Sequence, residues 1–351
     1  MMYFNLYIFA LLLNFIFTFA NFAPPGRCGH NAVLVDKKLY FHSGFNGDNG
    51  GFNLLKDFFN LDVSQNFTTK TLPWNDLTFT GVPPKPFASA CGGGNNNDLI
   101  FIFEGLSAPF NNISFTSQFD ISNQRWTNVI SPGNGPVKVE GTTSCAKFNN
   151  GSIAIIAGSI NVNPANDLWI FDTLKLTWSL NNEPNTPPRV YTYHAITLPD
   201  QTILYIGGCN DYIMPMDRLF LYDTASNTWK SLTTTGPTPP DRRYSSAVLT
   251  SDKRIIVFGG VNENDDAFGD LWILDIERNP YQWSARNISN PNGLTLCLHT
   301  ATLVDDYMIV AFGTNNINYS STIYMLDVSQ RDSYKWVTEF IPRTTNTTNF
   351  N

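Results

Sequence analysis

The sequence is poor in the residues from which most catalytic and metal centres are built. Its 351 residues include only four histidines and five cysteines. It has no paired-cysteine zinc motif, no glycine-rich phosphate loop and no serine nucleophile elbow, which argues against the common zinc, nucleotide and hydrolase sites. Charged residues make up 15% of the chain, and the lysines and arginines are scattered rather than clustered. We therefore expect no nucleic-acid groove, and the net charge of −7 indicates ordinary solubility.

Long apolar runs are also missing, except at the N-terminus. Residues 1–20, MMYFNLYIFALLLNFIFTFA, carry no charge and are almost wholly apolar. Thr18 and Ala20 are small residues of the kind that a signal peptidase prefers, so we predict a cleaved secretory signal peptide. No Lys or Arg precedes the apolar run, and an uncleaved membrane anchor of about twenty residues remains the alternative. Either way, the sequence predicts delivery through the secretory pathway, to the extracellular space or the cell surface.

Helix-period patterns are absent from the rest of the chain, and a repeat of about fifty residues takes their place. Residues 202–232 (TILYIGGCNDYIMPMDRLFLYDTASNTWKSL) and 254–285 (RIIVFGGVNENDDAFGDLWILDIERNPYQWSA) share one order: apolar run, Gly-Gly, polar loop, apolar run ending in Asp, and Trp. Six units in phase fill the chain from about Arg27 to Phe340. The marker residues are Trp74, Trp126, Trp178, Trp229, Trp283 and Trp336; Asp62, Asp120, Asp172, Asp223, Asp275 and Asp327; and Gly44, Gly105, Gly158, Gly208, Gly260 and Gly313.

Each unit predicts four short strands. Two apolar runs joined by a short polar turn, as in AVLVDKKLYFHSG, give one hairpin, and the run ending in Asp gives a second hairpin with the run into Trp. One such sheet is barely stable alone, but six packed face to face around an axis bury each other. The sequence therefore predicts an all-β, six-bladed β-propeller over residues 24–341, with repeats at roughly 27–80, 81–134, 135–184, 185–236, 237–290 and 291–341.

The repeat resembles the kelch repeat in three features: the Gly-Gly that ends the second strand, the aromatic residue and Asp of the third, and the Trp of the fourth. The resemblance covers nearly the whole chain after the leader. Four units keep only one glycine, as FHSG, FEG, AGS and FGT show. The resemblance implies a kelch-type propeller of the superfamily that includes galactose oxidase. We interpret the marker residues as structural, with Trp filling the gap between blades, Asp starting turns and Gly allowing close approach.

Three histidines could lie close to the propeller axis. Counting fourteen residues back from each marker glycine gives one position on the first strand, which is innermost in kelch-like propellers: His30, Cys91, Ser144, His194, Ser246 and His299. These histidines could surround a central ion, but a repeat position that tolerates His or Ser, with its side chain bonded to neighbouring backbone, explains the pattern better. We therefore predict no metal and no cofactor.

An enzymatic function is suggested only by the relatives of the fold. The resemblance extends to copper radical oxidases of the galactose oxidase type, whose site uses two Tyr, two His and a Cys crosslinked to one Tyr. No residues here match that arrangement, and His42 is the only further histidine. The Glu, Asp and His spacing of the iron-dependent plant kelch specifier proteins is also missing. We predict a protein that is not an enzyme, and keep a copper-dependent oxidase relative as the alternative.

The cysteines suggest a bridge that closes the ring. Cys28 and Cys297 each lie two residues before a histidine, on the first strands of blades one and six, which become neighbours when the ring shuts. We predict a disulfide between them in an oxidising compartment, with two buried free thiols as the alternative. Cys91 and Cys145 differ by one residue in phase, so we expect them to point to opposite faces and to pair less readily. Cys209 lies in a loop.

Six Asn-x-Ser/Thr sequons support the secretory address and predict a glycoprotein: Asn66, Asn112, Asn150, Asn287, Asn318 and Asn346. Residues 342–351, which end in RTTNTTNFN, are polar and lack strand periodicity. We interpret them as a linker or the start of a stalk, and keep a membrane tether beyond this tail or through the leader as an alternative.

The remaining prediction concerns a binding face. In kelch-like propellers, the loops between strands two and three and the loops between blades share one face, where partners usually dock. Here these loops are long and irregular, as at 46–56, 106–114, 209–217 and 261–269. Candidate anchors are Phe52, Phe110, Tyr212, Phe268, Arg189, Arg242 and Arg243. The sequence thus predicts a secreted or cell-surface, monomeric interaction module that binds a protein or glycan partner.

Overall fold

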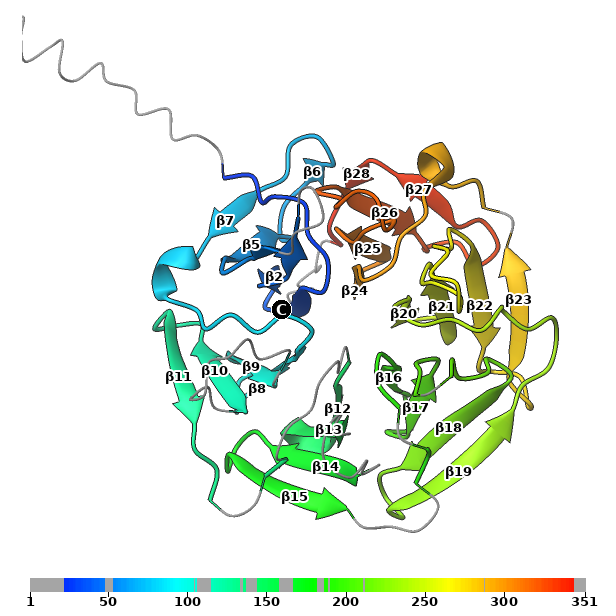
Figure 1. Cartoon of the computed structure of the whole chain (residues 1–351), viewed down its shortest axis with the longest axis horizontal. Helices are drawn as coiled ribbons and strands as arrows, with labels where there is room; N and C mark the ends of the chain where they lie inside the picture. Colours follow the sequence, from blue (N-terminus) through cyan, green and yellow to red (C-terminus); the bar gives the residue numbers. More distant parts are fainter. Residues whose placement is uncertain are drawn as a thin grey trace, which may run out of the picture.

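Six four-stranded antiparallel sheets surround a central axis, and each sheet is one blade of a β-propeller (Figure 1). The computed structural model describes residues 22–47, 53–103, 105, 115–132, 135–136, 144–157, 167–181, 186–188, 190–210, 212–286 and 288–343. Within this part of the chain the only helices are three short 3₁₀ turns, η1 (Thr78–Thr80), η2 (Asn149–Gly151) and η3 (Pro291–Gly293). The predicted all-β, six-bladed fold is confirmed.

The blades follow one another along the chain, and blades 2 to 6 are each built from four consecutive strands, whereas β3, β4 and β6 fall between the strands of blade 1. Blade 1 contains β1 (Asn31–Val35), β2 (Lys38–His42), β5 (Phe58–Asp62) and β7 (Trp74–Asp76), and blade 2 contains β8 (Ser89–Gly93), β9 (Leu99–Phe103), β10 (Thr116–Asp120) and β11 (Arg125–Val129). Blade 3 contains β12 (Ala146–Phe148), β13 (Ser152–Ala157), β14 (Asp167–Asp172) and β15 (Thr177–Asn181), and blade 4 contains β16 (His194–Thr197), β17 (Ile203–Ile206), β18 (Arg218–Asp223) and β19 (Thr228–Thr233). Blade 5 contains β20 (Ser246–Leu249), β21 (Arg254–Phe258), β22 (Leu271–Asp275) and β23 (Gln282–Arg286), and blade 6 contains β24 (Thr300–Val304), β25 (Tyr307–Ala311), β26 (Ile323–Asp327) and β27 (Lys335–Val337).

The hydrophobic core lies between the blades rather than at the axis. Successive side chains of a strand point to opposite faces of its sheet, so each middle strand serves two interfaces. Phe41 of β2 is fully buried against blade 6, where its ring meets the Phe312 ring edge to face, with the ring centroids 5.3 Å apart. Its neighbour Tyr40 points to the other face of the sheet and packs into the cluster shared with blade 2. This arrangement explains the nearly continuous apolar runs of the second and third strands, since both of their faces are buried.

The marker tryptophans fill the gaps between blades as predicted. Trp126 of blade 2 packs on Phe58 of blade 1 with the ring centroids 5.1 Å apart, and Trp178 of blade 3 packs on Phe103 of blade 2 with the ring centroids 5.4 Å apart. Trp283 of blade 5 is 1% exposed, and its indole nitrogen donates a hydrogen bond to the Met216 carbonyl of blade 4 at 2.9 Å. Each ring therefore supplies a large apolar surface at the point where two blades diverge.

The marker aspartates start turns, also as predicted. Asp62 Oδ1 accepts a hydrogen bond from the Ser64 backbone N–H at 2.9 Å, and Asp275 Oδ1 accepts one from Glu277 at 3.0 Å. Asp172, Asp223 and Asp327 make the same bond, and Asp120 Oδ1 accepts a hydrogen bond from the Asn123 backbone N–H, three residues further on, at 2.9 Å. Each carboxylate thereby fixes the turn between the third and fourth strands of its blade.

The two ends of the propeller meet in a small sheet of their own. β28 (Glu339–Phe340) pairs with β6 (Phe67–Thr68), which belongs to the long turn between β5 and β7 of blade 1 (Figure 1). The Phe67 and Phe340 rings stack with their centroids 4.7 Å apart, and Phe340 is fully buried. We call this two-stranded sheet the clasp. It closes the ring without exchanging a strand between blades.

No helix among the described residues is long and apolar enough to cross a membrane. The predicted leader at residues 1–20 and most of the polar tail at 342–351 lie outside the described residues.

Candidate functional site

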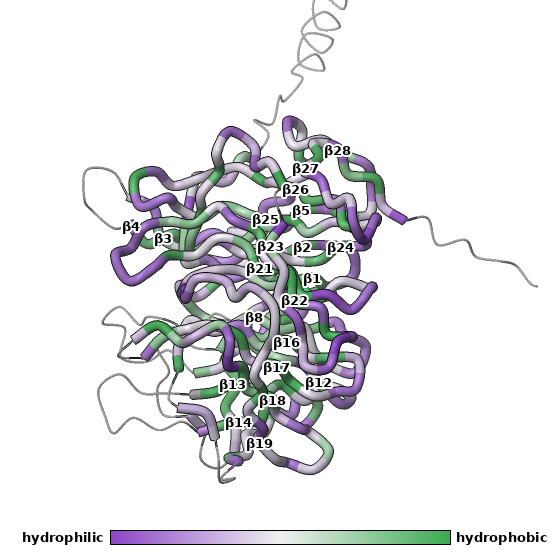
Figure 2. Tube along the Cα trace, turned by 90° about the vertical axis from the view of Figure 1, so that its right-hand side faces the viewer, coloured by the Kyte–Doolittle hydropathy of each residue, from purple (hydrophilic) through white to green (hydrophobic). Residues whose placement is uncertain are grey.

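In blades 1, 4, 5 and 6, the described parts of the loops between second and third strands lie at one face of the disc, together with the described connections between blades. We call this the loop face; β3 (Phe45–Asn46) and β4 (Asn53–Leu54) project from it (Figure 2). In blades 1, 4, 5 and 6, the connection entering the blade pairs with the start of this loop, and the loop then pairs with itself. The first set of pairs is Cys28↔Phe45, Tyr191↔Cys209, Arg243↔Val261 and Cys297↔Thr314. The described parts of these loops are therefore held by backbone hydrogen bonds and are not merely irregular.

Backbone hydrogen bonds also run from blade to blade on this side of the axis. The Phe87 N–H donates to the Gly29 carbonyl at 2.8 Å, Gly29 donates to Leu298 at 3.0 Å, and Leu298 donates to Tyr244 at 3.0 Å. All four residues have φ between 53° and 59°, the left-handed region. At Gly29 a Cβ atom would lie only 2.8 Å from the Phe87 ring, so no larger residue fits there without a shift. Blades 2, 1, 6 and 5 are thus tied together beside the central cavity.

The central cavity has a volume of about 190 Å³ and is lined by the first strands and the residues before them. Its polar lining includes the three histidines of the sequence prediction. His194 Nε2 donates to the Ser245 carbonyl at 2.7 Å, His30 Nε2 is hydrogen-bonded to Thr300 Oγ1 at 2.8 Å, and His299 Nε2 to Ser246 Oγ at 2.8 Å. Each bond crosses to a neighbouring blade, so the imidazoles connect blades to one another.

Burial keeps these imidazoles neutral. It lowers the pKa of His194 to about 4 and that of His299 to about 3. It also lowers the pKa of His30 well below its ordinary value, with smaller contributions from the charges of Arg27 and His299. Neutral imidazoles can make the inter-blade hydrogen bonds without burying a charge at the axis.

The six positions counted back from the marker glycines are not equivalent, which corrects the sequence interpretation. The strand register aligns Asn31 of blade 1 with Ser89, His194, Ser246 and Thr300 of other blades. His30 and His299 come one residue earlier, and Cys91 comes two residues later. A fixed count fails because the inner hairpins have turns of different length.

The histidines do not form a copper site of the oxidase type. Their Nε2 atoms are engaged in inter-blade hydrogen bonds, and His42 is bonded to Asn31 Nδ2 through Nδ1 and to the Pro83 carbonyl through Nε2. Among the described residues, no three His, Cys, Asp or Glu side chains come close enough together to hold a metal ion. The donor groups present therefore do not fit the arrangement of two Tyr, two His and one Cys.

Arg242 is a structural residue and not an exposed anchor, which corrects the prediction. Its side chain is fully buried, and its guanidinium binds both carboxylate oxygens of Asp270 at 2.7 and 2.9 Å. It also donates to the Gly259 and Pro240 carbonyls, both at 3.0 Å, and covers the Phe268 ring at 4.4 Å from the ring centroid. Phe268 is therefore partly covered as well.

The same buried cation recurs at the entry to other blades. Arg27 binds Asp57 through two hydrogen bonds of 2.6 Å and donates to the Pro25 and Ser43 carbonyls. Lys85 is 3% exposed and donates to the Phe115 carbonyl at 3.1 Å. All three cations follow a proline by two residues, as Pro25-x-Arg27, Pro83-x-Lys85 and Pro240-x-Arg242. That repeated spacing is the sequence signal that identifies Arg242 as structural.

The remaining anchors divide into three groups. Tyr212 is 57% exposed on the loop face. Arg243 is partly exposed and pairs with Asp265 at 2.7 Å. Phe52, Phe110 and Arg189 lie outside the described residues. Sequence reasoning missed Ile317, which is 81% exposed in the equivalent loop of blade 6, because an aliphatic residue is not a typical hot-spot residue.

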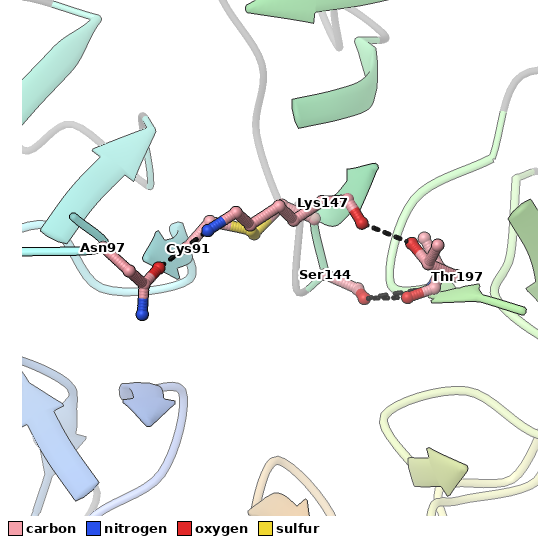
Figure 3. Close-up of a disulfide and its surroundings, with 7 residues drawn as sticks. Cys91, Asn97, Ser144, Lys147 and Thr197 are labelled. Carbon is pink, nitrogen blue, oxygen red and sulfur yellow. Dashed lines mark hydrogen bonds between the residues drawn. A yellow bond between two sulfur atoms is a disulfide. The ribbon is translucent and has the colours of Figure 1, made fainter. Parts of the chain in front are cut away.

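The cysteines pair differently from the prediction. Cys91 and Cys145 form a disulfide with their Cα atoms 6.4 Å apart, beside the hydrogen bond from Lys147 Nζ to Asn97 Oδ1 (Figure 3). Cys28, Cys297 and Cys209 are buried free thiols. The Cys297 thiol instead donates to the Thr314 carbonyl within its own blade. The predicted closure of the ring by Cys28 and Cys297 is thus wrong, and the clasp closes the ring.

Three of the six sequon asparagines lie among the described residues. Asn66 and Asn318 are exposed, and Asn150 is the middle residue of η2. Asn112, Asn287 and Asn346 lie outside the described residues.

Comparison with known proteins identifies the family. The KLHDC2/KLHL20/DRC7 Kelch-repeats domain model matches residues 29–253 and 194–348. The chain belongs to the kelch-repeat family. Propellers of this family generally act as protein-interaction modules.

Individual relatives are distant. Kelch domain-containing protein 1 of mouse is 24% identical over 69% of this chain, and Kelch domain-containing protein 3 of human is 24% identical over 83%. The match covers 63% of the first protein and 78% of the second, so this chain spans less than two-thirds of the length of Kelch domain-containing protein 1. The solved structure of YjhT superimposes with a TM-score of 0.65 at 12% identity, covering 90% of this chain and 98% of YjhT, which shows a shared fold.

Proposed function

We propose that the chain is a secreted or cell-surface kelch-repeat module that binds a protein or glycan partner through the loop face. One observation carries the proposal: exposed apolar side chains occur there on loops that backbone pairing holds in place. Tyr212 and Ile317 come from blades 4 and 6, on either side of the Arg243–Asp265 pair of blade 5. Asn316 Nδ2 donates to the Asp265 carbonyl at 2.5 Å, which connects the loops of blades 5 and 6. Ordered loops lose little conformational entropy on binding.

The test needs a partner, which affinity capture with the secreted protein would supply. Binding should then be compared between Tyr212→Ala combined with Arg243→Ala, and Lys37→Ala combined with Lys253→Ala in the turns of the opposite face. We expect the first double variant to weaken binding at least about tenfold, since aromatic residues and arginines that a partner covers are typical hot spots of an interface. Unchanged binding in the first double variant with loss in the second would place the site on the opposite face and end the proposal.

Secretion and glycosylation form a separate part of the proposal. The apolar leader and the sequons support it, and Asn66 and Asn318 are exposed as glycan acceptors must be. Protein collected from the medium of a eukaryotic culture should lose mass on treatment with an N-glycosidase, and its N-terminus should begin after residue 20. A full-length cytosolic protein without glycan would contradict secretion and glycosylation, but it would not affect the proposal that the loop face binds a partner.

The competing hypothesis is a copper radical oxidase relative, and a metal measurement separates the two. We expect purified protein to contain no stoichiometric transition metal and to release no peroxide from galactose or small alcohols. Tight copper binding that is lost in His30→Ala or His299→Ala would favour the oxidase. We also propose that the propeller is monomeric, which light scattering tests.

A further inference from the structure

A groove lies on the face opposite the loop face, where short turns of blades 2, 3 and 4 meet. It is formed by residues 94–97 between β8 and β9, by η2 with the end of β12, by Leu174 between β14 and β15, and by Gln201 between β16 and β17. Its volume is about 780 Å³. The groove thus belongs to neither the central cavity nor the loop face.

The lining of this groove is rich in carboxamides. Five of its side chains are amides: Asn95, Asn96, Asn97, Asn149 and Gln201. The corresponding turns of blades 1, 5 and 6 contain no carboxamide, whereas the turns of blades 2 and 4 carry Asp98 and Asp200 beside the amides. The groove contains no carboxylate, although acidic residues outnumber basic ones by 29 to 22 in the whole chain. This difference between blades defines the chemistry of the groove.

Two of the amides are already oriented by internal contacts. Asn97 Oδ1 accepts a hydrogen bond from Lys147 Nζ at 2.7 Å, as Figure 3 shows, and Gln201 Oε1 accepts one from the Asn149 backbone N–H at 3.1 Å. In both cases the bond uses the amide oxygen, which leaves the NH₂ group of the same side chain to donate elsewhere. Asn95 and Asn96 are exposed beside them, and Leu174, 53% exposed, supplies an apolar surface.

We propose that this groove binds a neutral saccharide. A carboxamide offers a donor and an acceptor side by side, which matches neighbouring sugar hydroxyls that both donate and accept. No carboxylate lines the groove itself, although Asp98 and Asp200 belong to its turns, and the single lysine is already bonded to Asn97, which disfavours an anion. A few convergent polar groups next to an apolar surface are typical of small-molecule sites.

The saccharide could come from another molecule or from this chain. The sequon residue Asn150 is the middle residue of η2, whose other two residues, Asn149 and Gly151, line the groove. A glycan attached to Asn150 would be held close to the groove at a high effective concentration. This second source depends on the proposed secretory address, whereas binding of a free saccharide does not.

The experiment uses unglycosylated protein produced in bacteria and refolded or secreted in an oxidising compartment. Chitobiose and cellobiose, two neutral disaccharides, are titrated while saturation-transfer NMR and calorimetry are recorded. We expect binding in the millimolar range for at least one of them, and about tenfold weaker binding for Asn96→Ala combined with Gln201→Ala, because two hydrogen bonds are lost. The control Lys37→Ala combined with Lys253→Ala should bind like the unaltered protein.

A second arm identifies the source. Protein made in a glycosylating host is compared with its Ser152→Ala variant, which lacks the sequon at Asn150. Loss of chitobiose binding in the glycosylated protein, with recovery in the variant, assigns the groove to the glycan of this chain; equal binding in both assigns it to a glycan of another molecule. No binding of either disaccharide to the unglycosylated protein, or equal binding by the groove variant, overturns the proposal without affecting the loop face.

Discussion

Cys91 and Cys145 are joined because their side chains point in opposite directions around the ring. Cys91 is paired with Phe101 in blade 2 and lies in the cluster that faces blade 3, against which Cys145 also packs. Adjacent blades pack face to face, so residues of opposite phase on consecutive blades meet. Cys28 and Cys297 have the same phase, and both point the same way around the ring. The one-residue offset that argued against the Cys91–Cys145 bond is what permits it.

The first prediction concerns this disulfide. It closes a loop with a sequence separation of 54 residues. The chain-entropy model then gives a stabilisation of about 4 kcal/mol, as an upper value. We expect Cys91→Ala combined with Cys145→Ala to lower the free energy of unfolding by about 2 to 4 kcal/mol in urea titrations.

Two measurements check the assignment of the disulfide. Peptide mapping of unreduced protein should give one cross-linked peptide containing Cys91 and Cys145. In the altered protein, a reducing agent should have no further effect on stability. A cross-linked peptide containing Cys28 and Cys297 would contradict the structure.

The second prediction separates the two adjacent arginines. Arg242→Ala should lower the free energy of unfolding by about 3 to 5 kcal/mol, because the carboxylate of Asp270 loses the partner that balances its partial burial. Arg243→Ala should cost about 1 kcal/mol or less, since its pair with Asp265 is exposed to solvent. Equal and small losses in both variants would mean that Arg242 is not the structural cation we describe.

The Arg242 pair also gives a pH dependence. Burial raises the pKa of Asp270, but the hydrogen bonds and charge of Arg242 outweigh it and lower the pKa below the ordinary value of 3.8. A lowered carboxyl pKa stabilises the folded state above the ordinary pKa, and this stabilisation is lost as the pH falls through the folded pKa. Below pH 4 the unaltered protein should therefore lose stability more steeply than Arg242→Ala.

The fold could be predicted from the sequence because the repeat is local and in phase. Trp126 and Asp275, for example, act through neighbours within their own or the adjacent blade, and each recurs at one place in the unit. The cysteine pairing could not be predicted from phase alone, because it depends on which sheet faces meet. The burial of Arg242 could have been predicted from the Pro-x-Arg spacing, whereas the exposure of Ile317 depends on the conformation of a loop.

A third prediction follows from the neutral imidazoles at the axis. Their folded pKa values lie below the ordinary value of 6.5, so the unfolded chain binds protons first as the pH falls. The stability that these groups contribute is complete above pH 6.5 and is lost progressively below it. For His299, with a folded pKa of about 3, the loss at pH 5 amounts to about 2 kcal/mol.

Replacing His299 tests this directly. We expect His299→Gln to lose about 2 kcal/mol less than the unaltered protein between pH 7 and pH 5, whatever its stability at pH 7. Urea midpoints measured across this range give the comparison. An unchanged pH slope would mean that the His299 imidazole is accessible to protons in the folded protein.

The fourth prediction concerns closure of the ring. Phe340 is fully buried in the clasp, where its ring stacks on Phe67 and packs on the Tyr307 ring with the centroids 4.9 Å apart. The adjacent Ile341 is 53% exposed. Phe340→Ala should therefore lower the free energy of unfolding by about 3 to 5 kcal/mol, and Ile341→Ala should change it little. Because β28 connects blade 6 to blade 1, amide exchange in Phe340→Ala should rise first in β24–β27 and in β1. Uniform exchange across all six blades would show that the clasp contributes packing but does not hold the two ends of the ring together.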